Sequence, residues 1–220
     1  MLYIVSTPIG NLEDMTFRAV KTLKESDLIA AEDTRHTPVL LKKYGIETPL
    51  TSFHSYSSDD KLEKIVEMLK DGKNISLVSD AGTPGISDPA YTLIRRAVDE
   101  GIKIIPIPGA SSLLAAVVVS GMPMDKFLYL GFLPLKKGRQ TLLNSLKEEQ
   151  RTIVIFEAPH RILRTLEDLL KYLGDREIAV CRELTKMYEE ILRVPISEAI
   201  SHFKKKNPKG EFVLVVKGAR

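Results

Sequence analysis

Residues 75–99, ISLVSDAGTPGISDPAYTLIRRAVD, contain a strand, a loop and a helix in that order. The first four residues are mostly apolar, as in a buried strand. Residues 79–89 are rich in Gly, Pro and Asp, which is typical of a loop. Residues 89–99 have the apolar spacing of a helix. This order is typical of an α/β fold built on a parallel sheet.

The same alternation extends to both sides of this stretch. Gly45 and Gly101 each follow a segment of helical spacing and mark its end. We predict strands at 2–5, 28–31, 50–53, 75–78 and 102–107, and helices at 16–24, 37–44, 59–70, 89–99 and 111–120.

The pattern changes after Gly121. We predict strands at 127–131, 152–156, 177–181, 188–194 and 211–216. Two of these form an antiparallel hairpin around residues 183–186. The expected fold class is α/β with two domains. Residues 1–121 form a domain with a mostly parallel sheet, and residues 122–220 form an α+β domain with a mixed sheet.

The composition excludes several classes of protein. The 220 residues are 44% apolar and 28% charged, as in ordinary globular proteins. A single cysteine excludes an intramolecular disulfide and a four-cysteine zinc site. The longest apolar run, residues 113–119, is far shorter than the ~20 residues of a membrane helix. The first residues do not form a secretory signal, so we expect a cytoplasmic protein without a membrane partner.

The net charge of +3 is unevenly distributed. Residues 1–120 contain 13 Lys and Arg against 16 Asp and Glu, whereas residues 121–220 contain 19 against 13. The basic clusters are at Lys136, Lys137 and Arg139 and at residues 204–209. Such clusters indicate either a polyanionic partner such as RNA or a solvated surface.

Three unusual loops follow predicted strands, at residues 6–11, 79–89 and 106–112. Each combines Pro, Gly and small hydroxyl residues, and ligands of open α/β sheets bind beyond the carboxyl ends of the strands. The sequence contains neither a dinucleotide fingerprint nor a P-loop motif. None of the three loops contains Lys or Arg, and Asp80 lies in one of them. They therefore suit a cationic ligand such as S-adenosylmethionine.

Metal binding and nucleophilic catalysis have little support. The four histidines are isolated in the sequence, so we expect no metal. Cys181 lies in an apolar strand, where a buried inert thiol is the better interpretation.

Charged clusters follow three other predicted strands, at residues 32–37, 156–161 and 182–186. Helix capping or structural ion pairs account for some of these side chains. Acids and bases together at a strand end also favour a reactive site.

Together with the loops, these clusters resemble a known family, the 16S ribosomal RNA cytidine 2′-O-methyltransferases. That family belongs to the tetrapyrrole-methylase-like, class III S-adenosylmethionine-dependent methyltransferases. The matching segments are 3–12, 30–37, 77–84, 106–112, 131–134, 159–161, 182–186 and 209–211.

The resemblance implies a homodimer of two-domain subunits that bind S-adenosylmethionine in a cleft between the domains. The implied cofactor residues are Pro8, Ile9, Ala81, Gly82, Thr83, Ile86, Ser111, Ser112, Leu184 and Gly210, with Glu157 or Ala158 at one further position. The Gly-Asp-Pro of the wider superfamily is Gly82-Thr83-Pro84 here, so Asp80 is the alternative carboxylate. Some relatives continue beyond the position of Arg220 with a helical segment, and substrate contacts made there are not expected here.

The expected activity is 2′-O-methylation of a cytidine ribose in small-subunit ribosomal RNA, free or in the assembled subunit. A small-molecule methyltransferase acting on a tetrapyrrole and a non-enzymatic RNA-binding module are the alternatives. A base for the 2′-hydroxyl proton would come from Asp33, Glu183 or Lys186. The expected RNA-binding residues are Arg35, His36, Lys136, Lys137, Arg139, His160 and Arg161.

Overall fold

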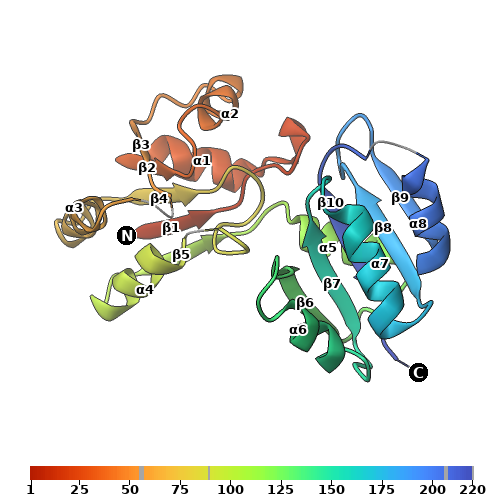
Figure 1. Ribbon diagram of the computed structural model, residues 1–220. Coiled ribbons are helices and arrows are strands. Elements are labelled where there is room, and N and C mark those ends of the chain that lie inside the picture. The colour runs from red at the N-terminus through yellow and green to blue at the C-terminus, as the bar shows by residue number, and fades with distance from the viewer. Residues whose placement is uncertain (55–56, 89, 206–207, 220) are drawn as a thin grey trace. The chain divides into compact units, whose positions relative to one another are not determined.

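The computed structural model describes residues 1–54, 57–88, 90–205 and 208–219. The chain divides into two compact units, Met1–Ser111 and Ser112–Arg220, and each is described by itself below. Figure 1 shows the helices and strands with the labels used here.

The first unit is built on a parallel sheet, in the order β3-β2-β4-β1-β5. Its strands are β1 (Leu2–Val5), β2 (Leu28–Ala31), β3 (Leu50–Ser52), β4 (Ile75–Val78) and β5 (Ile104–Ile107). All four residues of β4 are buried, as expected of a strand covered on both faces. Pro106 lies in β5, an edge strand, where its missing N–H removes no inner hydrogen bond.

Helices cover both faces of this sheet (Figure 1). They are α1 (Phe17–Glu25), α2 (Thr37–Lys43), α3 (Asp59–Lys70) and α4 (Tyr91–Asp99), with a short 3-10 helix, η1, at Leu12–Asp14. Ala19 and Leu23 of α1 and Leu41 of α2 share one core with Val5 and Ile29. Apolar residues of α3 and α4 form the other core with the opposite face of the sheet. The two layers of helices thus bury the apolar side chains on both faces of the sheet.

The second unit contains a mixed sheet, in the order β6-β7-β10-β8-β9. Its strands are β6 (Phe127–Phe132), β7 (Thr152–Glu157), β8 (Glu177–Arg182), β9 (Glu190–Pro195) and β10 (Phe212–Val216). β6 and β7 are parallel, whereas β10 is antiparallel to β7 and β8. β8 and β9 form the predicted antiparallel hairpin.

Helices pack on both faces of the second sheet. α6 (Arg139–Ser145), α7 (Ile162–Leu173) and α8 (Ile196–Lys204) contribute Leu143, Leu166 and Phe203 to one core. α5 (Ser112–Ser120) packs against β8, β9 and β10. The Cys181 thiol lies 4.0 Å from the Ala116 carbonyl oxygen of α5, on the face opposite Val180 and Ile178.

The α/β fold class is confirmed, with a parallel sheet in one unit and a mixed sheet in the other. Each predicted strand coincides with an observed one to within two residues at either end. The division between the units differs from the predicted one at 121/122, since it falls between Ser111 and Ser112. Helix α5 accounts for this difference because its apolar side chains pack on the second sheet.

Candidate functional site

Two of the predicted loops meet at the carboxyl ends of β1 and β4. Thr7 and Gly82 form an isolated antiparallel bridge, with N–O distances of 2.9 and 3.1 Å. The Ser6 and Thr83 hydroxyls lie 2.9 Å apart. Gly82 has a φ of +81°, and a Cβ atom there would lie 3.4 Å from Ile9 Cγ2. Glycine therefore allows the close approach of the two loops.

The third loop joins them from β5. The Thr83 hydroxyl donates to the Ala110 carbonyl at 3.4 Å. A Cβ atom on Gly109 would lie 3.0 Å from Ser6 Cβ, so this backbone also approaches its neighbour closely. The predicted convergence of the three loops is confirmed within the first unit.

Carboxylates surround the ends of β2 and β4. Asp80 accepts from the Asp33 backbone N–H at 3.1 Å, and Glu32 accepts from the Asp80 N–H at 3.3 Å. Burial raises the pKa of Glu32, and the charges of Asp80, Asp88 and Asp33 act in the same direction, against the opposing hydrogen bond from Asp80. This edge of the sheet has the negative character that suits a cationic ligand.

Asp33 is engaged by Arg35. Arg35 Nε lies 3.0 and 3.1 Å from the two Asp33 carboxylate oxygens, and Nη2 lies 2.6 Å from Oδ2. The Arg35 side chain and its backbone N–H hold the pKa of Asp33 well below its usual range. Asp33 is therefore a weak base with a fixed orientation, and the exposed Arg35 extends from it.

One group of side chains has the composition of a metal site. Asp33, His36 and Asp80 each offer one ligand atom, and these atoms lie within 4.8 Å of one another. Both Asp33 oxygens accept from the Arg35 guanidinium, whose positive charge opposes a cation at the same carboxylate. This competition is an argument against a cation at Asp33, and the absence of a metal stays a prediction.

Three segments that are distant in the sequence meet at one end of the second sheet, where β7 and β8 end and β10 begins. Phe212 of β10 pairs with Glu157 of β7 on one side and with Arg182 of β8 on the other. The segments around Ala158, Leu184 and Gly210, all expected to contact the cofactor, therefore gather at the same sheet edge. Leu184 is buried, whereas Ala158 and Gly210 are half-buried.

Glu183 is tightly held at this edge. Its Oε1 accepts from the Glu211 N–H at 2.9 Å and from Lys186 Nζ at 3.0 Å. Its φ of +51° is left-handed, which is uncommon for a residue other than glycine. Burial alone would raise the pKa of Glu183, but the Glu211 N–H and the Lys186 ammonium lower it below its usual value.

Lys186 is a cation rather than a base. Its ammonium lies 2.9 Å from Glu211 Oε2 and 3.0 Å from Glu183 Oε1. Burial lowers its pKa, but these two carboxylates outweigh that effect and leave the pKa raised. The expectation that Lys186 accepts a proton is not supported by this geometry.

The structure corrects the expectation for Arg139. Its side chain is only 5% exposed, and Nε lies 2.8 Å from Asp168 Oδ2. The remaining donors reach the Pro134 carbonyl and the Thr165 hydroxyl, at 3.1 and 2.8 Å. A guanidinium with these partners does not bind RNA phosphate, although its neighbours Lys136 and Lys137 are exposed.

The network continues to the end of β7. The Thr165 hydroxyl donates to Glu157 Oε2 at 2.5 Å, and Arg161 Nε lies 3.1 Å from Glu157 Oε1. Arg161 is 16% exposed and also donates to the Leu133 carbonyl at 2.5 Å. Arg161 thus holds two loops together, which leaves little of its side chain for RNA. The adjacent His160 is exposed.

The remaining predicted residues lie at the loops of the first unit or beside them, except Ser112, which is the first residue of the second unit. Pro8, Ile9 and Gly82 are buried, Thr83, Ser111 and Ser112 are half-buried, and Asp80, Ala81, Ile86, Arg35 and His36 are exposed. The sequence analysis included Ser6 and Thr7 in loop 6–11 and Glu32 in the charged cluster 32–37 but gave them no individual role, and it missed the hydroxyl of Thr165 in the second unit. Ser6 and Thr7 directly precede Pro8 at a strand end, which is a signal that could have identified them.

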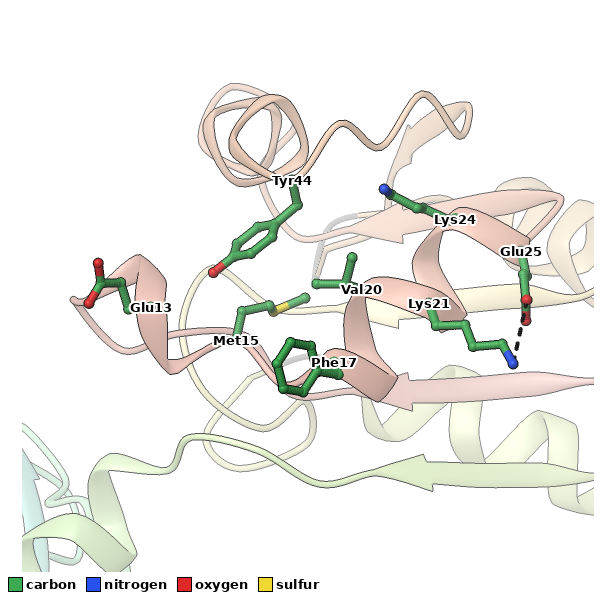
Figure 2. Close-up of a pocket in the computed structure, with 8 residues that line it drawn as sticks. All are labelled: Glu13, Met15, Phe17, Val20, Lys21, Lys24, Glu25 and Tyr44. Carbon is green, nitrogen blue, oxygen red and sulfur yellow. Dashed lines mark ion pairs between the residues drawn. The ribbon is translucent and has the colours of Figure 1, made fainter.

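A separate groove lies beside α1 (Figure 2). Its volume is about 550 Å³, and Met15, Val20 and Tyr44 contribute apolar surface to it. Phe17 is 97% exposed, and Lys21 lies beside Glu25. None of the expected cofactor or RNA residues lines this groove.

In the part of the chain that the structure describes, the helices are too short or too polar to cross a membrane.

The fold and the loops define the class of this protein. Residues 1–200 match the model of the tetrapyrrole (corrin/porphyrin) methylases, and the chain belongs to that family. The methyl donor of the family is S-adenosylmethionine. The first unit fits this cofactor: the described residues of its three loops offer carbonyls and hydroxyls without Lys or Arg, and carboxylates lie beside them.

Individual relatives are similar over nearly the whole chain. A Thermotoga maritima protein named ribosomal RNA small subunit methyltransferase I is 54% identical, over 99% of this chain and 98% of its own length. A Bacillus subtilis protein of the same name is 52% identical over 100% of this chain and 75% of its length. The solved structure of cobalt precorrin-4 methyltransferase has a TM-score of 0.74, with 16% identity and coverage of 98% of this chain and 94% of that one. That similarity shows the fold alone.

Proposed function

We propose that this protein transfers the methyl group of S-adenosylmethionine to the 2′-oxygen of a cytidine ribose in small-subunit ribosomal RNA. The observation that carries the proposal is the 54% identity to the Thermotoga maritima methyltransferase over nearly the full length of both chains. The substrate is the free RNA or the assembled small subunit. A homodimer in the cytoplasm is part of the same proposal.

The cofactor contacts follow from the loops. In the first unit, Pro8, Ile9, Ala81, Gly82, Thr83, Ile86 and Ser111 would hold the cofactor, with Asp80 facing its positive charge. In the second unit, Ser112, Ala158, Leu184 and Gly210 are the proposed contacts. When bound, S-adenosylmethionine supplies a methyl group on a positively charged sulfur. The protein must place the ribose oxygen in line with that methyl group, which is a large source of acceleration.

The contacts of the three candidate bases differ, and these differences support one of them. Arg35 occupies both oxygens of Asp33, which favours Asp33 as the residue that orients Arg35 toward a phosphate. Lys186 is protonated and stabilises the carboxylates beside it. Glu183 is ionised, and its recorded hydrogen bonds end on Oε1. We therefore propose that Glu183 Oε2 accepts the 2′-hydroxyl proton as the new O–C bond forms and the bond between the methyl carbon and the sulfur breaks, its electron pair going to the sulfur.

The test uses S-adenosylmethionine with a radiolabelled methyl group. The protein is incubated with ribosomal RNA, free and in small subunits, and the label is mapped by nuclease digestion. A 2′-O-methyl group blocks alkaline cleavage of the adjacent phosphodiester, so the label should appear in an alkali-resistant dinucleotide that contains cytidine. Label in an alkali-sensitive product would contradict ribose methylation.

The alternatives have their own outcomes in this assay. Label transferred to a tetrapyrrole but not to RNA would favour the small-molecule methyltransferase, whose fold this chain shares. RNA binding without cofactor binding in calorimetry would favour the RNA-binding module.

A further inference from the structure

Strand β6 contains an irregularity that redirects one aromatic side chain. Tyr129 pairs with Val154, but the next recorded pair is Phe132 with Phe156. From the first pair to the second, β6 continues by three residues and β7 by only two, so β6 contains one extra residue, a β-bulge. Gly131, which lies in this bulge, has a φ of +61°. Without this bulge, alternation would turn Phe132 toward the same core as Leu128 and Leu130. The bulge instead places it with Tyr129 on the opposite face.

The Phe132 ring packs against another aromatic ring on one side and is half exposed to solvent. The Phe132 and Phe156 ring centres lie 5.8 Å apart at 71°, and Tyr129 meets Phe156 at 5.2 Å and 69°. Both contacts are edge-to-face, a favourable aromatic geometry. Phe132 nevertheless remains 50% exposed. A ring that is held in position and retains free surface suits stacking with another planar group.

The segment after this ring is also held in place. Arg161 donates to the Leu133 carbonyl at 2.5 Å, and Arg139 donates to the Pro134 carbonyl at 3.1 Å. Leu133 itself is 1% exposed. These anchors give the ring and the residues after it one defined arrangement.

All the charged residues of the segment that contains Phe132 are basic. Residues 126–147 contain no Asp or Glu, and Lys136 and Lys137 are exposed just beyond Phe132. An aromatic ring beside free cations is the chemistry that binds unpaired nucleotides, because bases stack on the ring and phosphates pair with the cations. Two exposed lysines and no nearby acid in sequence favour a polyanion over a second protein.

We propose that Phe132 stacks against an unpaired base of the RNA substrate while Lys136 and Lys137 contact its phosphates. This rests on the proposed function for the identity of the partner. RNA binding is measured without methyl transfer, so the two proposals fail in distinguishable ways.

The probe is a fluorescein-labelled single-stranded RNA oligonucleotide, and the readout is its anisotropy with the full chain at several salt concentrations. Phe132→Ala should weaken binding about tenfold without changing the salt dependence. Phe132→Tyr retains the ring and should bind like the unmodified protein. Lys136→Ala with Lys137→Ala should flatten the salt dependence by about one unit or more, because phosphate contacts are lost.

Phe132→Leu separates stacking from simple apolar contact. It should weaken binding nearly as much as Phe132→Ala, and binding equal to that of the unmodified protein would overturn the proposal. An altered affinity for S-adenosylmethionine in Phe132→Tyr, or a change of oligomeric state in Phe132→Ala by sedimentation, would also overturn it. The first would assign the ring to the cofactor and the second to another copy of the chain. Gly131→Ala, which disfavours the bulge, should reproduce the loss of RNA affinity if the direction of the ring matters.

Discussion

Gly210 and Glu183 are in such close contact that a Cβ atom on Gly210 would lie 2.5 Å from Glu183 Cδ. The backbone around both residues is left-handed, with φ values of +91° and +51°. The absent side chain of one residue thus leaves room for the carboxylate that we propose as the base.

Gly210→Ala should displace this carboxylate. We expect a loss of about 1–3 kcal/mol in the free energy of unfolding, from the strained φ and the contact together, and a slower methyl transfer. Gly174→Ala is the matched control, because Gly174 has a φ of +81° and nothing within 4 Å of the added Cβ. Urea unfolding and single-turnover rates measure both variants. Equal stability and equal rates in the two would show that the contact with Glu183 is unimportant.

Arg139→Ala should destabilise the second unit strongly. The substitution removes the guanidinium that binds Asp168 and the Thr165 hydroxyl, and Thr165 in turn binds Glu157. Removing one partner of a buried ion pair lowers the free energy of unfolding by about 3–5 kcal/mol. Lys136→Ala, at an exposed neighbour, should change stability by about 0.5 kcal/mol or less. Urea titration of each variant gives the comparison. A similar midpoint for both would contradict the structural role of Arg139.

Asp33 and Arg35 should act as a unit in RNA binding. Asp33→Asn and Arg35→Ala should each weaken RNA affinity, and the double variant should be little worse than either single variant, because residues in contact are not additive. Affinity for S-adenosylmethionine, measured by calorimetry, should not change. If Asp33→Asn instead slows single-turnover methyl transfer with unchanged RNA affinity, Asp33 rather than Glu183 is the base.

Burial raises the pKa of the Cys181 thiol from 9.0 to about 11. The folded state therefore keeps the thiol neutral at pH values where the unfolded chain ionises it. The stabilisation is complete below pH 9 and is lost as the pH rises through 11. The stability advantage of the unmodified protein over Cys181→Ala should accordingly shrink between these pH values. A thiol reagent should label Cys181 at pH 8 only after unfolding, and rapid labelling of the folded protein would show that the thiol is accessible.

Chelation should not affect cofactor binding. Arg35 already satisfies the carboxylate of Asp33, so the group of Asp33, His36 and Asp80 should not require an ion. Calorimetry with S-adenosylmethionine should give one affinity with and without EDTA. Weaker binding in EDTA, restored by a divalent cation, would contradict the metal-free site.

The sequence predicted what depends on local pattern. The β-branched runs located the strands. The Pro and Gly residues identified the loops at 6–11 and 79–89, which the bridge between Thr7 and Gly82 brings together. Arg139 was misinterpreted because its immediate neighbours are basic and exposed. Its burial depends on Thr165 and Asp168, which are more than twenty residues away and leave no signal at residues 136–139.

The domain division was harder to predict for a related reason. The sequence of the apolar residues 113–119 is equally compatible with the last helix of the first unit and the first helix of the second. Only their packing against β8, β9 and β10 decides between the two. Similarly, Glu183 combines a left-handed φ with a hydrogen bond from the Glu211 N–H, and no sequence pattern marks that conformation.

The position of β1 between β4 and β5 has a consequence for biosynthesis. Leu2–Val5 is translated well before its partners, which are β4 and β5, and Val5 pairs with Ile107. Both edges of this apolar strand can be paired only after about a hundred further residues have been translated. Pairing between such distant segments is slow because a long loop must close first. During this interval the nascent chain exposes an unpaired strand, the kind of surface that chaperones shield from aggregation.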